Sequence, residues 1–241
     1  MSIEVPFTKD NLEYYLKELA KEYRKRSHGI PAEMILVGGA SVLLNYGFRS
    51  ASYDIDAYYE AQTVMKEAIH AVGDRLGLPI GWINDDFKRT ASFSPKIVQY
   101  SEYYKTFSDV LTIRTVRAEY LVAMKLMSGR QYKKDLSDIA GVVYEQQLAE
   151  KPLSYERIDT AVCNLYGGWT GISDNAKAVL EKILSYEDLK TLFLELSEDE
   201  ASARAAIVEM EHKYPGVVKK SNVEEIIAAA LKKKREENTQ Q

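Results

Sequence analysis

The chain has 241 residues, 46% of them hydrophobic and 28% charged, which fits a globular protein of one large domain or two small ones and argues against a disordered chain. Its net charge of −4 argues against a general nucleic-acid-binding protein, although a local basic surface stays open. No stretch reaches the roughly 18 apolar residues of a transmembrane helix, and residues 1–10 lack the pattern of a signal peptide, so we expect a cytoplasmic protein without a membrane partner.

Residues 1–117 alternate between helical and strand patterns. Apolar side chains at helical spacing after Thr8 or Asp10 predict an opening helix, and the continuous apolar run at 34–37 predicts a strand covered on both faces. In chain order we expect helices at 8–26, 40–46 and 61–76, and strands at 34–37, 54–56, 97–104 and 110–116. The sequence therefore predicts an α/β (α+β) fold with a small mixed sheet at its core.

After Arg117 only helical periodicity is found, which predicts a helical bundle. The expected helices are 119–128, 135–148, 154–166, 174–196, 198–212 and 223–235. We predict a first domain at 1–150 and a helical domain at 151–241, although the helices between 118 and 150 could pack on either. The single cysteine, Cys163, has apolar neighbours and is expected to be buried.

Asp54 and Asp56 stand two residues apart in a strand-like segment. Because successive side chains of a strand point to opposite faces, both carboxylates project to one side while Ile55 faces the core. Mg²⁺ favours ligation by one or two carboxylates together with substrate phosphates. The pair therefore predicts a site for Mg²⁺, or Mn²⁺, bound together with a triphosphate.

Gly38 and Gly39 follow the apolar strand and precede a short helix. Glycines let a backbone come close to a ligand, and the exposed amides at a helix start favour an anion, so we expect a phosphate between these glycines and the Ser41 hydroxyl. A side chain at Gly39 is expected to collide with that phosphate. The segment has neither the Gly-Lys-Ser/Thr ending of a Walker A loop nor the spacing of a dinucleotide fingerprint.

Together these motifs resemble the signature of the DNA polymerase beta-like nucleotidyltransferase superfamily, in its minimal bacterial branch. The resembling residues are Gly38-Gly39, a helix start of small residues, Gly47-Phe48-Arg49, and Ser52 followed by Asp54 and Asp56. Those families also carry a later helix with a lone lysine, then an arginine and a Lys-Asp-x-x-Asp segment, and this chain has Lys125, Arg130, Lys134, Asp135 and Asp138 in that order. The resemblance covers residues 30–145, and the branch includes toxins of abortive-infection type toxin–antitoxin pairs.

The resemblance implies roles for individual residues. Asp54, Asp56, Lys125 and Asp138 would be catalytic, and the two Asp54 and Asp56 carboxylates would hold the metal. Gly38, Gly39, Ser41, Arg49, Ser52, Lys125 and Asp135 would bind the nucleotide. Lys125 is the only charged residue within the apolar run at 121–127, and its alternative is a structural lysine that reaches solvent or pairs with Asp135 or Asp138.

The superfamily normally adds a third carboxylate from a neighbouring strand, and the expected strand at 110–116 contains none. Asp85, Asp86 and Asp109 flank the later strands, and the spacing does not choose among them. A missing third carboxylate would favour a catalytically inactive regulator that binds nucleotide or a partner protein.

A second group of residues raises the question of an RNA partner. Basic side chains alternate with tyrosines between the Asp pair and the helical half: Lys88, Arg89, Lys96, Lys105, Arg114 and Arg117, with Tyr100, Tyr103 and Tyr104. Bases stack on aromatic rings and phosphates pair with Lys or Arg, so this group could line an RNA cleft. Tyrosines on a strand more often pack at a sheet face.

These observations predict a metal-dependent nucleotidyltransferase that transfers NMP from an NTP to an acceptor hydroxyl. The resemblance to the toxin branch favours RNA, in particular tRNA, or protein as the acceptor, and it implies a cognate antitoxin. The alternatives are an inactive regulator with the same fold and an antitoxin-like binding protein in which the helical half is the functional part.

Overall fold

The computed structural model describes residues 6–60, 62–129, 135–219 and 222–239, and its packing divides the chain into two compact units. Unit 1 comprises the described residues up to Met124 together with Leu153–Gly171, and unit 2 comprises the described residues of Lys125–Pro152 and those from Ile172 onward. Among the described residues, no helix has the length and apolar character needed to cross a membrane.

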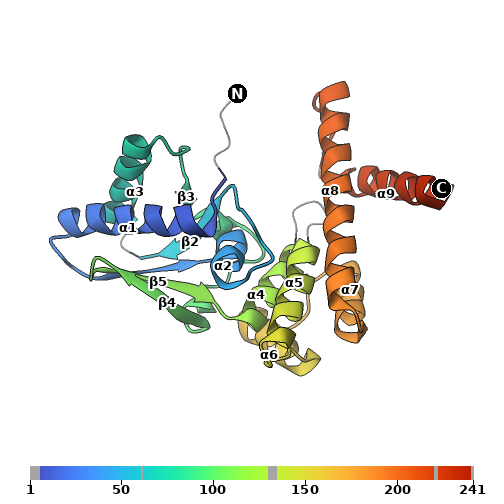
Figure 1. Cartoon of the computed structure of the whole chain (residues 1–241), viewed down its shortest axis with the longest axis horizontal. Coiled ribbons are helices and arrows are strands. Elements are labelled where there is room, and N and C mark those ends of the chain that lie inside the picture. Colours follow the sequence, from blue (N-terminus) through green and yellow to red (C-terminus); the bar gives the residue numbers. More distant parts are fainter. Residues whose placement is uncertain (1–5, 61, 130–134, 220–221, 240–241) are drawn as a thin grey trace. The chain divides into compact units, whose positions relative to one another are not determined.

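Unit 1 is built on one five-stranded sheet in the order β3-β2-β1-β5-β4 (Figure 1). Its elements before α4 are α1 (Lys9–Arg26), β1 (Ala32–Leu36), α2 (Gly38–Asn45), β2 (Ile55–Tyr59), α3 (Gln62–Leu76), β3 (Ile83–Asn84), β4 (Ser101–Phe107) and β5 (Leu111–Val116), with 3₁₀ turns at Asp86–Arg89 and Pro95–Val98. β1 is parallel to β5 and antiparallel to β2, β2 is parallel to β3, and β4 is antiparallel to β5. The predicted α/β core with a small mixed sheet is confirmed.

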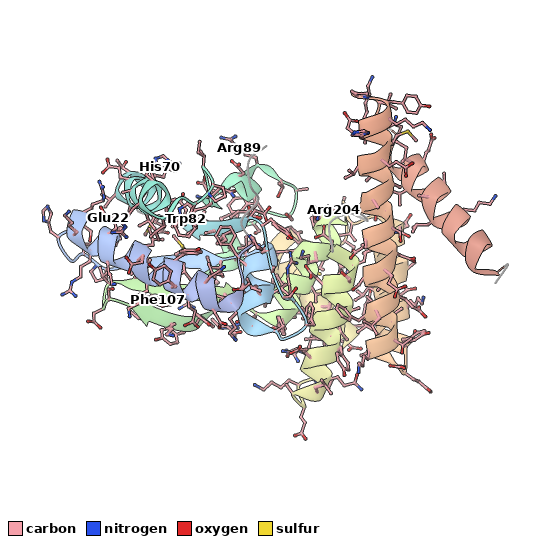
Figure 2. The ribbon with its side chains drawn as sticks, turned by 45° about the horizontal axis from the view of Figure 1, so that its top comes forward. Glu22, His70, Trp82, Arg89, Phe107 and Arg204 are labelled. Carbon is pink, nitrogen blue, oxygen red and sulfur yellow. The ribbon has the colours of Figure 1, made fainter. Side chains whose placement is uncertain are left out.

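Helices α1 and α3 pack together over one face of this sheet (Figure 1). Strand residues that alternate along β1, β2 and β5 point to that face and are buried, among them Met34, Leu36, Ile55, Ala57 and Ile113. Trp82, labelled in Figure 2, joins the same core, and its indole N–H donates to the Ile69 carbonyl at 3.0 Å. This packing fixes which strand side chains face the opposite side of the sheet, and Asp56 is one of them.

The remaining elements are helices α4 (Ala118–Ser128), α5 (Asp135–Leu148), α6 (Tyr155–Tyr166), α7 (Asp174–Ser185), α8 (Leu189–Lys213) and α9 (Val223–Thr239). In unit 2, α5 contacts both α7 and α8, and α8 contacts α9. The expected helical second half is confirmed, and α5 has the predicted bounds.

One predicted helix boundary was wrong. The expected break at Ser197 does not occur: the Ser197 hydroxyl donates to the Phe193 carbonyl at 2.8 Å inside the continuous helix α8. The chain instead breaks before Asp188, whose carboxylate accepts hydrogen bonds from the Thr191 amide at 3.1 Å and the Thr191 hydroxyl at 2.6 Å. Asp188 is therefore the N-cap of α8.

Helix α6 belongs to unit 1, where it packs against the segment between β3 and β4. The buried Ser94 hydroxyl donates to the Leu165 carbonyl at 3.0 Å, and the Lys96 ammonium donates to the Asn164 carbonyl at 2.9 Å. The Tyr166 hydroxyl donates to the Ser92 carbonyl at 2.8 Å. Unit 1 is thus completed by a helix that follows unit 2 residues in the chain, and the predicted division into domains at 1–150 and 151–241 stays a prediction.

Candidate functional site

The glycine turn after β1 adopts a backbone that favours glycine. Gly38 has a φ of +52°, in the left-handed region that side chains rarely adopt, and α2 begins there. The residue before α2 is Val37, whose side chain cannot cap a helix. The first amides of α2 therefore point out of the helix end without a cap from Val37, which is the arrangement that favours an anion.

Asp56 lies directly against this turn. The Val37 amide donates to the Asp56 carbonyl at 3.0 Å, which ties the start of β2 to the end of β1. A Cβ atom added to Gly38 would lie 3.6 Å from Asp56 Oδ2. The structure thus brings one of the two predicted metal-binding carboxylates to the predicted phosphate-binding turn.

Asp54 precedes β2 by one residue and is exposed, whereas Asp56 is half-buried. The intervening Ile55 has no exposed surface, as the alternation of a strand predicts. Among the described residues, no group of three or more His, Cys, Asp or Glu side chains is arranged to hold a metal ion. Two carboxylates completed by phosphate oxygens suit Mg²⁺, so the donor set fits a metal that arrives with a triphosphate.

Arg49 and Ser52 form the other wall of the turn. A Cβ atom on Gly39 would lie 2.7 Å from Arg49 Nη2 and 2.7 Å from Ser52 Oγ. The Arg49 Nε donates to the Ala51 carbonyl at 3.2 Å, and the Ser52 hydroxyl donates to the Asp54 carbonyl at 3.0 Å. The predicted residues Gly39, Arg49, Ser52 and Asp54 are therefore neighbours in the fold.

Ser41 and Ser52, both predicted to bind nucleotide, have no exposed surface in this structure. The Ser41 hydroxyl accepts a hydrogen bond from the Val116 amide at 3.2 Å. Ser52 is paired with Phe7 through both backbone hydrogen bonds, at 2.7 and 2.9 Å. Both serines therefore stabilise the backbone around the glycine turn. Arg49, by contrast, is half-buried and so keeps part of its surface exposed.

The contacts around Gly39 predict a steric conflict on substitution. Gly39→Ala should destabilise unit 1 by roughly 1–3 kcal/mol, because the added methyl group overlaps Arg49 and Ser52 before any ligand is bound. Adding Ser52→Ala removes one of the overlapping atoms, so the double variant should be less destabilised than the sum of the single variants. Chemical unfolding of the wild type and the three variants measures this coupling, and strict additivity would show that the two residues do not collide.

The residue that pairs with Asp56 on β3, and the residues on its sheet face on β5, one strand beyond β1, are not carboxylates. On β5, Arg114 and Val116 alternate with the buried Ile113 and so lie on the sheet face of Asp56. On β3, the residue paired with Asp56 is Asn84.

The three flanking aspartates proposed from the sequence occupy other places. Asp109 lies in the turn before β5, beside the start of β1, whereas the glycine turn follows the end of β1. The Asp85 carboxylate forms an ion pair with the Lys88 ammonium at 3.0 Å. Asp86 is exposed in the 3₁₀ turn that follows β3.

The predicted second block lies in unit 2, where Lys125 sits in a buried ion-pair cluster. Its ammonium is 2.8 Å from Asp135 Oδ1 and 2.8 Å from Asp138 Oδ2. The exposed fractions of these side chains are 9% for Lys125, 0% for Asp135 and 3% for Asp138. The structure therefore brings these three predicted residues together, in the arrangement that the sequence left open as a structural alternative. Arg130 and Lys134 lie outside the described residues.

Glu200 on α8 joins this cluster and was missed by the sequence analysis. Its carboxylate accepts hydrogen bonds from the Leu136 amide at 2.9 Å, the Ser137 amide at 3.3 Å and the Ser137 hydroxyl. Burial, with a further contribution from the negative charge of Asp138, raises the pKa of Glu200 to about 7 although the hydrogen bonds oppose this shift. A signal was present in the sequence, because Glu200 falls on the same helical stripe as the buried residues Leu192 and Ala203.

Most members of the predicted RNA-binding group are held by other groups of the protein. Ion pairs or hydrogen bonds join Lys88 to Asp85, Lys96 to Asn164, Lys105 to Glu13 and Arg114 to Ser101. Tyr100 stacks on Tyr120 with ring centroids 4.0 Å apart, and the Tyr104 hydroxyl donates to Glu13 at 2.5 Å. Arg89 and Arg117 are exposed.

Comparison with known proteins identifies a family. No curated protein and no solved structure matches the chain. A family model described as a nucleotidyltransferase of unknown function (DUF6036) matches residues 12–166, which is more than half of the chain. The matched part contains the glycine turn, the Asp54 and Asp56 pair and the Lys125 cluster, and it ends before Glu200. The chain therefore belongs to this family of nucleotidyltransferases.

Proposed function

We propose that this protein is a metal-dependent nucleotidyltransferase that moves a nucleoside monophosphate from an NTP to an acceptor hydroxyl. The observation that carries the proposal is the contact between the Gly38 turn and the Asp56 carboxylate, 3.6 Å from the position of an added Cβ atom. It brings a helix end that favours phosphate next to Asp56, one of the two carboxylates proposed to bind a divalent cation. Family membership supports the same reaction class.

In the proposed reaction, the acceptor oxygen forms a bond to the α-phosphorus, the bond to the β-phosphate oxygen breaks, and pyrophosphate leaves while the hydroxyl proton passes to solvent. Mg²⁺ or Mn²⁺ would screen the phosphates and lower the pKa of the attacking hydroxyl. Asp54 and Asp56 would hold the metal, and the amides of the Gly38–Gly39 turn would orient the phosphates. The Arg49 guanidinium beside Gly39 would add positive charge at the same place.

Lys125, with Asp135 and Asp138, is proposed to contribute to the nucleotide site, as the resemblance to the superfamily implies. A lysine near the leaving pyrophosphate would stabilise the negative charge that develops there.

The acceptor is proposed to be RNA, in particular tRNA, or protein, with the enzyme acting in the cytoplasm. The resemblance to abortive-infection type toxins adds the proposal that the protein is the toxin of a toxin–antitoxin pair and has a cognate antitoxin.

A specific observation favours a second function, that of an inactive family member that binds nucleotide or a partner protein as a regulator. Asp56 pairs with Asn84 on β3 and shares its sheet face with Arg114 and Val116 on β5, so none of these positions holds a third carboxylate. The other alternative is an antitoxin-like binding protein, in which the helical half would be the functional part.

Incubation of the purified protein with each labelled NTP, Mg²⁺ and total cellular RNA or protein tests the first function. We expect label from one NTP in one class of acceptor, release of pyrophosphate in equal amount, and loss of both with a metal chelator. Binding of NTP with Mg²⁺ but no transfer to RNA or protein would contradict the enzyme and support the regulator. The absence of both binding and transfer would contradict the enzyme and also a regulator that binds nucleotide.

A further inference from the structure

Glu200 is a buried carboxylate in the middle of a long helix. Its exposed fraction is 5%, and a buried carboxylate is costly unless hydrogen bonds or charges compensate it. Leu192 and Ala203, which lie on the same stripe of α8 as Glu200, are buried as well, so this face of the helix turns inward. A carboxylate in such a position has a structural or functional reason.

The hydrogen bonds of Glu200 show that its carboxylate binds the first turn of α5. Helix α5 begins at Asp135, so the Leu136 and Ser137 amides belong to its first turn, where an acceptor from outside the helix can hold the backbone. Glu200 Oε1 accepts from both amides, and the other carboxylate oxygen accepts from the Ser137 hydroxyl. Glu200 therefore caps α5 from a different helix, and its negative charge suits the positive end of the helix dipole.

The two capped residues stand between the carboxylates that bind Lys125. Leu136 follows Asp135 and Ser137 precedes Asp138, and both aspartates are 2.8 Å from the Lys125 ammonium. The backbone held by Glu200 is thus the backbone that carries both partners of Lys125. Movement of this turn would move both carboxylates, and with them the lysine.

We propose that Glu200 is a positioning residue for Lys125, and that it fixes the Lys125 ammonium by holding the first turn of α5. The part of this inference that concerns transfer rests on the proposed function, in which Lys125 contributes to the reaction. Glu200 lies beyond residues 12–166 that the family model matches, so within unit 2 the α8 helix supplies a contact to the first turn of α5 that lies outside the matched segment.

The test uses the full chain with Glu200→Ala and Glu200→Gln, and Glu195→Gln as a matched control for an exposed carboxylate of the same helix. The first readout is the hydrogen-exchange rate of the Leu136 and Ser137 amides, and the second is the rate at which acetic anhydride modifies Lys125. Neither requires activity. Far-UV circular dichroism shows whether each variant is folded under the conditions compared.

We expect Glu200→Ala to raise the exchange of both amides and the modification of Lys125 about tenfold or more, since the cap and the position of the ion pairs are lost together. Glu200→Gln keeps an acceptor oxygen for the two amides and should restore most of the protection, while Glu195→Gln should behave as the wild type. In the transfer assay, Glu200→Ala should lower kcat more than it changes KM.

Unchanged Lys125 modification in folded Glu200→Ala would overturn the proposal. Increased modification with an unchanged kcat would also overturn it, because Glu200 would then be structural only. If the wild type transfers no label from any NTP, the proposed function fails. The modification rate of Lys125 still tests the positioning role in that case: a higher rate in Glu200→Ala than in the wild type supports it, and an equal rate contradicts it.

Discussion

Replacing Asp54 and Asp56 together by asparagine should abolish the thermal stabilisation that NTP and Mg²⁺ give to the wild type and should lower transfer about a thousandfold. The Asp56 carboxylate lies beside the glycine turn, and with Asp54 it would provide the charge that lets a cation and a triphosphate bind together. A bound metal contributes several kcal/mol to such a reaction, which corresponds to about three orders of magnitude in rate. Thermal unfolding with and without NTP and Mg²⁺ measures binding, and label transfer measures the rate.

The matched control for this double variant is Asp74→Asn, which removes an exposed carboxylate from α3 in the same unit. It should retain both the thermal shift and the transfer rate. An unchanged shift in Asp54→Asn/Asp56→Asn would place nucleotide binding elsewhere in the chain. A lost shift with wild-type transfer would show that the shift reports on a site unrelated to the reaction.

Lys125→Ala should destabilise unit 2 by about 3–5 kcal/mol, because it leaves Asp135 and Asp138 as buried charges without their common ion-pair partner. The catalytic role that the resemblance implies for Lys125 predicts an effect on turnover, and the burial of these pairs adds a large effect on folding. Chemical unfolding measures the loss, and Lys190→Ala, an exposed lysine of α8, serves as the control with little expected change.

A compensated variant separates the charge effect from the loss of packing. Lys125→Met combined with Asp135→Asn and Asp138→Asn keeps similar side-chain volumes and removes all three charges. It should recover most of the stability lost in Lys125→Ala and remain inactive if the ammonium acts in transfer. A triple variant with wild-type turnover would remove Lys125 from the reaction, and a triple variant no more stable than Lys125→Ala would show that uncompensated charge is not the cause.

The sequence predicted the local elements of unit 1 well because local signals determine them. The cap of α1 is Thr8, one of the two predicted candidates, and its hydroxyl accepts from the Asn11 amide at 3.4 Å. Strand alternation placed Ile55 in the core and Asp56 on the other face. The expected strand at 97–104 was partly wrong, since Pro95–Val98 forms a 3₁₀ turn and the strand begins at Ser101.

Residues whose environment depends on distant segments were harder to predict. Cys163 was expected to be buried because of its apolar neighbours, but it is exposed, since the inward face of α6 passes through Ile158, Ala161, Val162 and Leu165. The contact between Glu200 and α5 joins residues more than sixty positions apart, and no local pattern encodes it. The approach of Asp56 to Gly38 was predictable because β1, the glycine turn, α2 and β2 follow one another in one short motif, in which β1 and β2 pair.

The interleaving of the two units has a consequence for folding during synthesis. Unit 1 needs α6, whose carbonyls accept from the buried Ser94 hydroxyl and from Lys96, but the chain reaches Leu153 only after the part of unit 2 that begins at Lys125. At translation rates of about 5–20 residues per second, roughly 2 to 10 s pass between the synthesis of Val116, the last residue of the sheet, and that of Tyr166, the last residue of α6. During that interval the surface that α6 covers in the folded protein is exposed on the nascent chain. A ribosome-associated chaperone that binds this surface would bind it in that interval.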